Sequence, residues 1–189
     1  MGIIEMTSWT GEDLLTFYQT LYRTYGSQNW WPADSAFETI IGAIFAQNVS
    51  WKGAHQAVCA FIDADPLEPQ KLYTAVQDVI VTKIRSSRYY NQKARKVMTF
   101  LEWFLGSCNG DISRMAAKPA DQVREELLIL SGFGHETVDS MLFYALGKPV
   151  FVVDAYTKRV GSRQGWFPET ILYDQMQNKS WRWVGWSIK

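Results

Sequence analysis

Two glycines flank a single apolar residue in the tripeptide Gly132-Phe133-Gly134, which separates two stretches of helical periodicity. The first stretch ends just before Ser131, and the second runs from about 135 to 146. Glycine takes positive φ without a steric penalty, so this spacing predicts a tight hairpin that leaves backbone N–H groups exposed. Those groups lie at the start of the second helix, where the helix dipole favours an anion. The pattern therefore predicts a hairpin that binds a phosphate group.

Asp154 stands directly after Val152 and Val153, at the end of the segment that follows this second helix. Asp is a favoured N-cap, so Asp154 could simply cap a helix that begins at Ala155. A Gly-x-Gly sequence could equally be an ordinary connection between two helices. The hairpin and the aspartate in this order form a much more specific pattern than either feature alone.

The order Leu-x-Gly-x-Gly, helix and Val-Val-Asp resembles the helix-hairpin-helix DNA glycosylase superfamily, which includes endonuclease III. The resemblance implies two helical lobes with a DNA-binding cleft, and it places the helix-hairpin-helix motif at about 120–146. It implies that Asp154 is catalytic. It also implies a monomer whose partner is double-stranded DNA containing damaged bases. It assigns DNA contact to hairpin residues Gly132, Phe133, Gly134, His135 and Thr137, although His135 could be only a surface residue.

Helical periodicity extends over nearly the whole chain, and no segment alternates convincingly with the period of a strand, so we expect an all-α fold. The patterns predict helices at about 12–25, 35–47, 50–62, 70–76, 92–105, 120–130, 135–146, 155–166 and from 173 onward, with a helical turn at 79–84. A capping box from Ser35 to Glu38 marks the start of the second helix. The core stripe of the helix at 92–105 is expected to be Val97, Phe100, Leu101 and Phe104. Residues 1–176 are expected to form the core, with a central lobe at 30–150 and a second, incomplete lobe from 1–28 and 155–176. The remaining residues, 177–189, are expected to form an atypical tail, in which 178–189 fit no helix face, and we expect a truncation or alteration near Asn178.

The composition excludes several classes of protein. A hydrophobic content of 47% over 189 residues is enough to bury a core, while no apolar run approaches the ~20 residues that span a membrane. The first residues lack a basic segment followed by an apolar core, so we expect a cytoplasmic protein of the bacterial cytosol and nucleoid, without a membrane partner. The two cysteines, Cys59 and Cys108, support neither a disulfide framework nor a metal site, and we expect no cofactor.

A local cluster of positive charge stands out against a formal net charge of zero. The segment from Lys83 to Lys96 contains six basic residues and no acidic residue. Such a segment could be only a solvated helix face. It also resembles the Tyr-Asn-x-Lys-Ala segment of the endonuclease III family, which favours a DNA-facing edge and assigns DNA contact to Arg88 and Lys93.

Glu136 distinguishes this chain from the branch of the superfamily that cleaves DNA strands, because that branch has a lysine at this position. A carboxylate cannot form the imine that this lysine forms, so the sequence predicts a monofunctional glycosylase that uses water. Together with Trp30-Trp31-Pro32 and the stretch AFETIIGAIFAQNVSWKGA, this substitution resembles the bacterial 3-methyladenine DNA glycosylase III family. That resemblance implies a damaged base stacked between Trp30 and Trp51, with Trp31 and Pro32 also binding the base and with Glu136 in the pocket as a catalytic residue beside Asp154. It leaves the family's C-terminal pocket lysine without a match.

The implied chemistry is consistent with these residue types. A base alkylated on a ring nitrogen is a cation with a weakened glycosidic bond, so aromatic faces can recognise it, and Asp154 can stabilise the sugar cation and orient water. Trp30 and Trp51 are nevertheless two of nine tryptophans and could be core or rim residues. Gln47 and Asn48 could end a helix or lie at the DNA-facing mouth, where Gln47 could fill the space left by a flipped base.

Three functions remain open from the sequence. The first is an alkylbase DNA glycosylase that releases a base from a flipped nucleotide without nicking DNA. A second is an endonuclease III-like glycosylase and lyase that acts on other lesions, against which Glu136 argues. The third is a truncated, catalytically impaired protein that still binds DNA.

Overall fold

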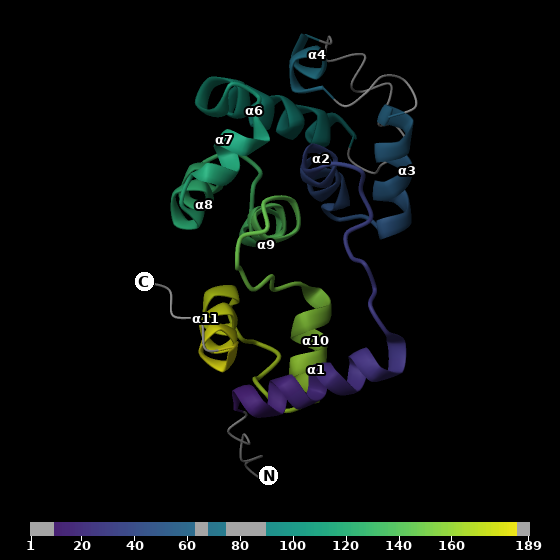
Figure 1. Ribbon diagram of the computed structural model, residues 1–189, viewed down its shortest axis with the longest axis vertical. Helices are drawn as coiled ribbons and strands as arrows, with labels where there is room; N and C mark the ends of the chain where they lie inside the picture. The colour runs from purple at the N-terminus through teal and green to yellow at the C-terminus, as the bar shows by residue number, and fades with distance from the viewer. Residues whose placement is uncertain (1–9, 63–67, 75–89, 185–189) are drawn as a thin grey trace. The chain divides into compact units, whose positions relative to one another are not determined.

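The computed structural model describes residues 10–62, 68–74 and 90–184, and these residues divide into two compact units. One unit comprises the described parts of Met1–Trp30 and Phe151–Lys189, and the other comprises the described parts of Trp31–Val150. Figure 1 shows the helices of both units.

All regular structure in the described residues is helical, which confirms the all-α fold. The elements are α1 (Gly11–Tyr25), α2 (Ala36–Ala46), α3 (Trp51–Ile62), α4 (Pro69–Thr74), α6 (Tyr90–Cys108), α7 (Ile112–Ala117), α8 (Ala120–Leu128), α9 (His135–Ser140), the π-helix η1 (Met141–Ala145), α10 (Ala155–Arg163) and α11 (Tyr173–Val184). The turn expected at 79–84 lies outside the described residues. No described helix is both long enough and apolar enough to cross a lipid bilayer.

Helix α2 forms the centre of the larger unit. Its residues 37–45 are all buried, and it contacts α3, α6, α9 and η1. The Ser35 hydroxyl accepts a hydrogen bond from the Glu38 amide, as the predicted capping box requires. The Glu38 carboxylate accepts from the amide of Asp34, 2.8 Å from Oε2, so the return bond of the capping box is made one residue before the N-cap. This apolar helix therefore begins at the residue that its sequence indicates.

Helix α6 packs a continuous apolar stripe into the same core. Its four predicted core residues, Val97, Phe100, Leu101 and Phe104, are completely buried. Phe104 also stacks on Phe37 of α2, with 6.0 Å between the ring centroids. Spacing at three and four residues places these side chains on one face of the helix, which is why the sequence pattern predicted the stripe correctly.

The helix expected at 135–146 is not a single α-helix. It changes after Ser140 into the π-helix η1, and the Leu146 amide donates to the Met141 carbonyl, five residues earlier. A π turn inserts one residue relative to an α-helix and shifts the side chains that follow. The prediction of one continuous α-helix was therefore wrong for its second half.

The smaller unit has a core of its own. Val153, Trp166, Phe167, Ile171 and Met176 form a buried cluster, and Leu14 and Phe17 of α1 pack against it. Helix α1 also contacts α11 (Figure 1). At Gly161 of α10 an added Cβ would lie 2.1 Å from Cζ of Phe167, so only glycine allows this ring to lie against the helix.

The expectation that residues from 178 onward fit no helix was wrong for residues 178–184, because α11 continues through them. Its buried face is partly polar. Met176, Gln177 and Ser180 are buried, and the Gln177 amide donates to the Phe151 carbonyl over 2.9 Å. A search for apolar periodicity does not detect a face that buries glutamine and serine. The side chains of Trp181, Trp183 and Trp186 lie outside the described residues.

Candidate nucleic-acid interface and base pocket

The hairpin between α8 and α9 forms as predicted, but its two glycines have different roles. Gly132 has φ +90°, a conformation that favours glycine, while Gly134 has φ −101° and is the N-cap of α9. The Phe133 amide closes the turn on the Leu130 carbonyl at 3.2 Å. The Phe133 side chain is buried, so it anchors the hairpin, and only its backbone is available to a partner. The expectation of positive φ thus applies to Gly132 alone.

Gln47, the C-cap of α2, is bound to this hairpin from a distant part of the sequence. Its Nε2 donates to the Thr137 hydroxyl over 2.9 Å and to the Gly132 carbonyl over 3.3 Å. Its Oε1 accepts a hydrogen bond from Nζ of Lys96. Both ends of the amide are engaged inside the protein, whereas the neighbouring Asn48 is exposed and has φ +57°. Filling a space in DNA would require Gln47 to leave these partners.

Lys93 is not on the surface, so its predicted contact with DNA was wrong for this structure. Its side chain is 2% exposed, and its ammonium donates to the carbonyl of Phe45 at 2.6 Å. Burial, with a smaller contribution from the nearby Lys96 charge, lowers the pKa of Lys93 to about 8. The lysine satisfies a carbonyl at the C-terminal end of α2, where a cation also complements the helix dipole. Arg88 lies outside the described residues.

His135, the first residue of α9, is held by an ion pair in which only the carboxylate is fully buried. Asp139 is completely buried and accepts two hydrogen bonds from Arg124 of α8, at 2.7 and 3.2 Å. The same guanidinium lies 2.9 Å from Nδ1 of His135. Since a guanidinium only donates, Nδ1 acts as the acceptor and the ring proton of the neutral form is on Nε2. The ion pair thereby orients His135 beside the hairpin.

Asp154 is the N-cap of α10. Its Oδ1 accepts hydrogen bonds from the backbone amide and the hydroxyl of Thr157, both at 2.6 Å. Its Oδ2 has no hydrogen-bond partner in the part of the chain that the structure describes. Asp154 therefore does cap α10, and the cap uses only Oδ1, which leaves Oδ2 available to a ligand.

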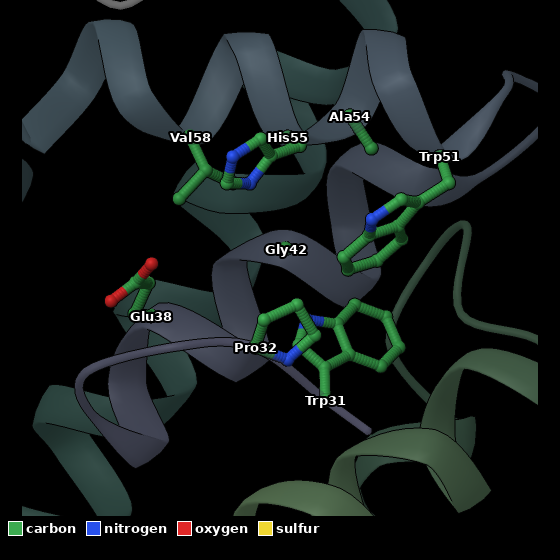
Figure 2. Close-up of a pocket in the computed structure, with 8 residues that line it drawn as sticks. All are labelled: Trp31, Pro32, Glu38, Gly42, Trp51, Ala54, His55 and Val58. Carbon is green, nitrogen blue, oxygen red and sulfur yellow. The ribbon is translucent and has the colours of Figure 1, made fainter. Parts of the chain in front are cut away.

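A hollow lies between α2, α3 and the segment that leads into α2 (Figure 2). It has an empty volume of about 230 Å³, which includes space open to solvent. Its lining consists of Trp31, Pro32, Glu38, Gly42, Trp51, Ala54, His55 and Val58. The four residues from α3 occur at intervals of three and four and therefore share one helix face. Three of the four predicted base-binding residues, Trp31, Pro32 and Trp51, are brought together here.

The two indoles in the hollow meet edge to face. The ring centroids of Trp31 and Trp51 are 4.6 Å apart with an interplanar angle of 85°. Gly42 allows this arrangement, because an added Cβ there would lie 3.3 Å from Nε1 of Trp31. Trp30 is 48% exposed and belongs to the other compact unit. Glu136 is exposed at the first turn of α9.

Four side chains beside these residues were not selected from the sequence as site residues. Glu38 and His55 line the hollow, Lys96 binds Gln47, and Arg124 orients His135. His55 follows Trp51 by four residues, so helical spacing could have placed it on the same face. Glu38 was interpreted only as a capping residue, and nothing local to Lys96 or Arg124 indicates their partners.

The architecture is similar to solved structures of DNA glycosylases. The 3-methyladenine DNA glycosylase MagIII of H. pylori, solved with 1,N6-ethenoadenine bound, has a TM-score of 0.81 at 24% identity, covering 94% of this chain and 83% of that one. A structure of endonuclease III trapped covalently on DNA has a TM-score of 0.78 at 19% identity, covering 95% and 82%. The chain therefore has the helical fold of these two enzymes.

Sequence comparison identifies the family. Residues 41–185 match the description "HhH-GPD superfamily base excision DNA repair protein". A protein of Methanocaldococcus jannaschii, named provisionally as a DNA repair glycosylase, is 39% identical over 168 residues, which cover 88% of this chain and 76% of the relative. The chain belongs to the HhH-GPD superfamily of base excision DNA repair proteins.

Proposed function

We propose that this protein is a monofunctional DNA glycosylase that hydrolyses the N-glycosidic bond of alkylated, 3-methyladenine-like bases flipped out of duplex DNA. The observation that carries the proposal is the aromatic hollow with a carboxylate in its wall. Trp31 and Trp51 offer π faces to a cationic base, an attraction of about 1–2 kcal/mol when desolvated. Glu38, 8% exposed in the same wall, adds negative charge beside that cation. Trp30 is proposed as a further stacking residue.

Asp154 is proposed as the catalytic residue. Its Oδ1 is engaged by Thr157, which orients the carboxylate, while Oδ2 can face the sugar. A carboxylate there stabilises the positive charge that develops as the glycosidic bond breaks, and it orients the attacking water. The cationic base needs little protonation to depart. Glu136, at the position of the lyase lysine, supports hydrolysis without strand cleavage.

The DNA contacts are proposed for the backbone of the hairpin. Gly132 and Gly134 allow close approach of a phosphate, with His135 and Thr137 in the first turn of α9 beside it. Asn48, exposed after α2, is proposed to lie at the DNA-facing side together with Gln47. The proposed substrate class, alkylated bases similar to 3-methyladenine, is supported by the MagIII structure, which was solved with a modified adenine.

Base release from methylated duplex DNA tests the proposal, with strand integrity measured on the same sample. The decisive variant is Asp154→Asn, because Asn is an equally good N-cap and the change removes the charge while keeping the cap. Asp111→Asn is the matched control, since Asp111 caps α7 through its side chain in the same way. We expect free 3-methyladenine and intact strands from wild type and Asp111→Asn, and a loss of at least ~100-fold in Asp154→Asn.

Two results would contradict the proposal. Full base release by Asp154→Asn would remove the aspartate from the mechanism. Trapping of a protein–DNA adduct by borohydride, with nicked product, would show imine chemistry and replace the monofunctional assignment by a glycosylase and lyase.

A further inference from the structure

The side chain of Lys96 lies directly against the backbone of the hairpin. If Gly132 carried a Cβ, that atom would be 2.5 Å from Cε of Lys96 and 3.0 Å from its Cγ. Such distances are shorter than contact between carbon atoms, so the aliphatic stem of Lys96 occupies the space that a side chain would fill. Gly132 is thus needed both for its φ of +90° and for the approach of this lysine.

The ammonium of Lys96 is held at this place by Gln47. Lys96 can only donate and the Gly132 carbonyl can only accept, so the orientation of the Gln47 amide is determined by its partners. Oε1 faces Lys96, while Nε2 faces the Gly132 carbonyl and the Thr137 hydroxyl. The three contacts connect α6 and the end of α2 to the turn of the hairpin and to α9.

Lys96 is the basic side chain that the structure places against the turn of the hairpin. Residues 131–134 of the hairpin carry no charged side chain. Lys93, three residues before Lys96 on α6, directs its ammonium to the Phe45 carbonyl instead. The Lys96 side chain is half-buried, and this burial lowers the pKa of its ammonium. A partly desolvated cation acts on a nearby anion with less screening than an exposed one.

We propose that Lys96 supplies the positive charge of the hairpin's DNA-backbone site, and that Gln47 is a positioning residue that holds this ammonium against Gly132. The inference rests on the proposed function, since it takes duplex DNA as the partner. It differs from the sequence expectation, in which Gln47 fills a space inside the DNA.

The salt dependence of DNA binding tests the inference. Fluorescence anisotropy with a labelled undamaged duplex gives Kd at several salt concentrations for the full chain and for Lys96→Gln, Lys96→Arg and Gln47→Leu. The control is Lys71→Gln, because Lys71 is an exposed lysine of α4 paired with Glu68. Thermal melting of each variant shows whether it is folded.

Lys96→Gln is expected to weaken binding about tenfold and to reduce the slope of log Kd against log salt by about one phosphate contact. Lys96→Arg keeps the charge and should restore the slope. Gln47→Leu should keep the slope but weaken binding, because the charge remains and only its placement is lost. The control should match the wild type.

An unchanged salt slope in folded Lys96→Gln would overturn the inference, even if affinity falls, because a purely structural loss does not remove a charge contact. A slope reduced as strongly in Gln47→Leu as in Lys96→Gln would overturn the positioning role. Base release by the same wild-type preparation separates this test from the proposed function. If the wild type releases the base but Lys96→Gln keeps the wild-type salt slope, only the inference is refuted. If the slope falls in Lys96→Gln but the wild type releases no base, only the proposed substrate is refuted.

Discussion

Lys93 has an ammonium that is buried in the folded chain and hydrated in the unfolded one, so its titration should change stability. Its pKa falls from 10.5 to about 8 because burial, and secondarily the charge of Lys96, disfavour the protonated form. Between these two values the unfolded state binds more protons than the folded state. The free energy of unfolding therefore rises with pH in this window.

The size of the effect follows from the two pKa values. The difference of about 2.5 units corresponds to about 3.4 kcal/mol at 1.36 kcal/mol per unit, reached only above pH 10.5. Between pH 7 and pH 10 the expected gain is about 2.5 kcal/mol. The hydrogen bond to the Phe45 carbonyl can persist, since a neutral amine still has N–H groups to donate.

The assay is denaturant unfolding at intervals from pH 7 to pH 10, with wild type compared with Lys93→Met. Subtraction removes the other groups that titrate in both proteins, and Lys71→Met provides an exposed-lysine control that should follow the wild type. We expect the wild type to gain about 2.5 kcal/mol relative to Lys93→Met across this range. A difference that stays constant with pH would refute the reasoning, because it would mean that the lysine titrates alike in both states.

Two further predictions concern packing and charge inside each unit. Gly161→Ala should lower the free energy of unfolding by about 1–2 kcal/mol, since the clash with Phe167 exceeds the gain in helix propensity. In a Phe167→Leu background the same change should cost less, and an equal cost in both backgrounds would exclude the clash. Asp139→Asn should cost about 3–5 kcal/mol in chemical denaturation, because it leaves the Arg124 guanidinium without its buried partner. Removal of both charges in Arg124→Met with Asp139→Leu should cost less than Asp139→Asn, and a larger cost would contradict this account.

Local features of the sequence were sufficient for the turn of the hairpin, the start of α2 and the core face of α6. Positive φ at Gly132, the cap at Ser35 and the stripe of α6 each depend on residues a few positions apart. Interactions of this range are visible as spacing. Where helical faces bury polar groups, as at Gln177 in α11, the same method failed, because burial there depends on a hydrogen bond to Phe151, 26 residues away.

In the candidate site, the residue types could be predicted from the sequence, but their contacts could not. The sequence by itself determined that the chain carries a Gly-Phe-Gly hairpin, an aspartate at a helix start and a glutamate in place of a lysine, because these are statements about order and residue type. Only the tertiary structure decided what surrounds them. Gln47 finds its partners 85 and 90 residues away, and Lys93 is buried against a carbonyl 48 residues away. Such contacts depend on how helices pack, and packing brings together residues whose separation along the chain carries no signal.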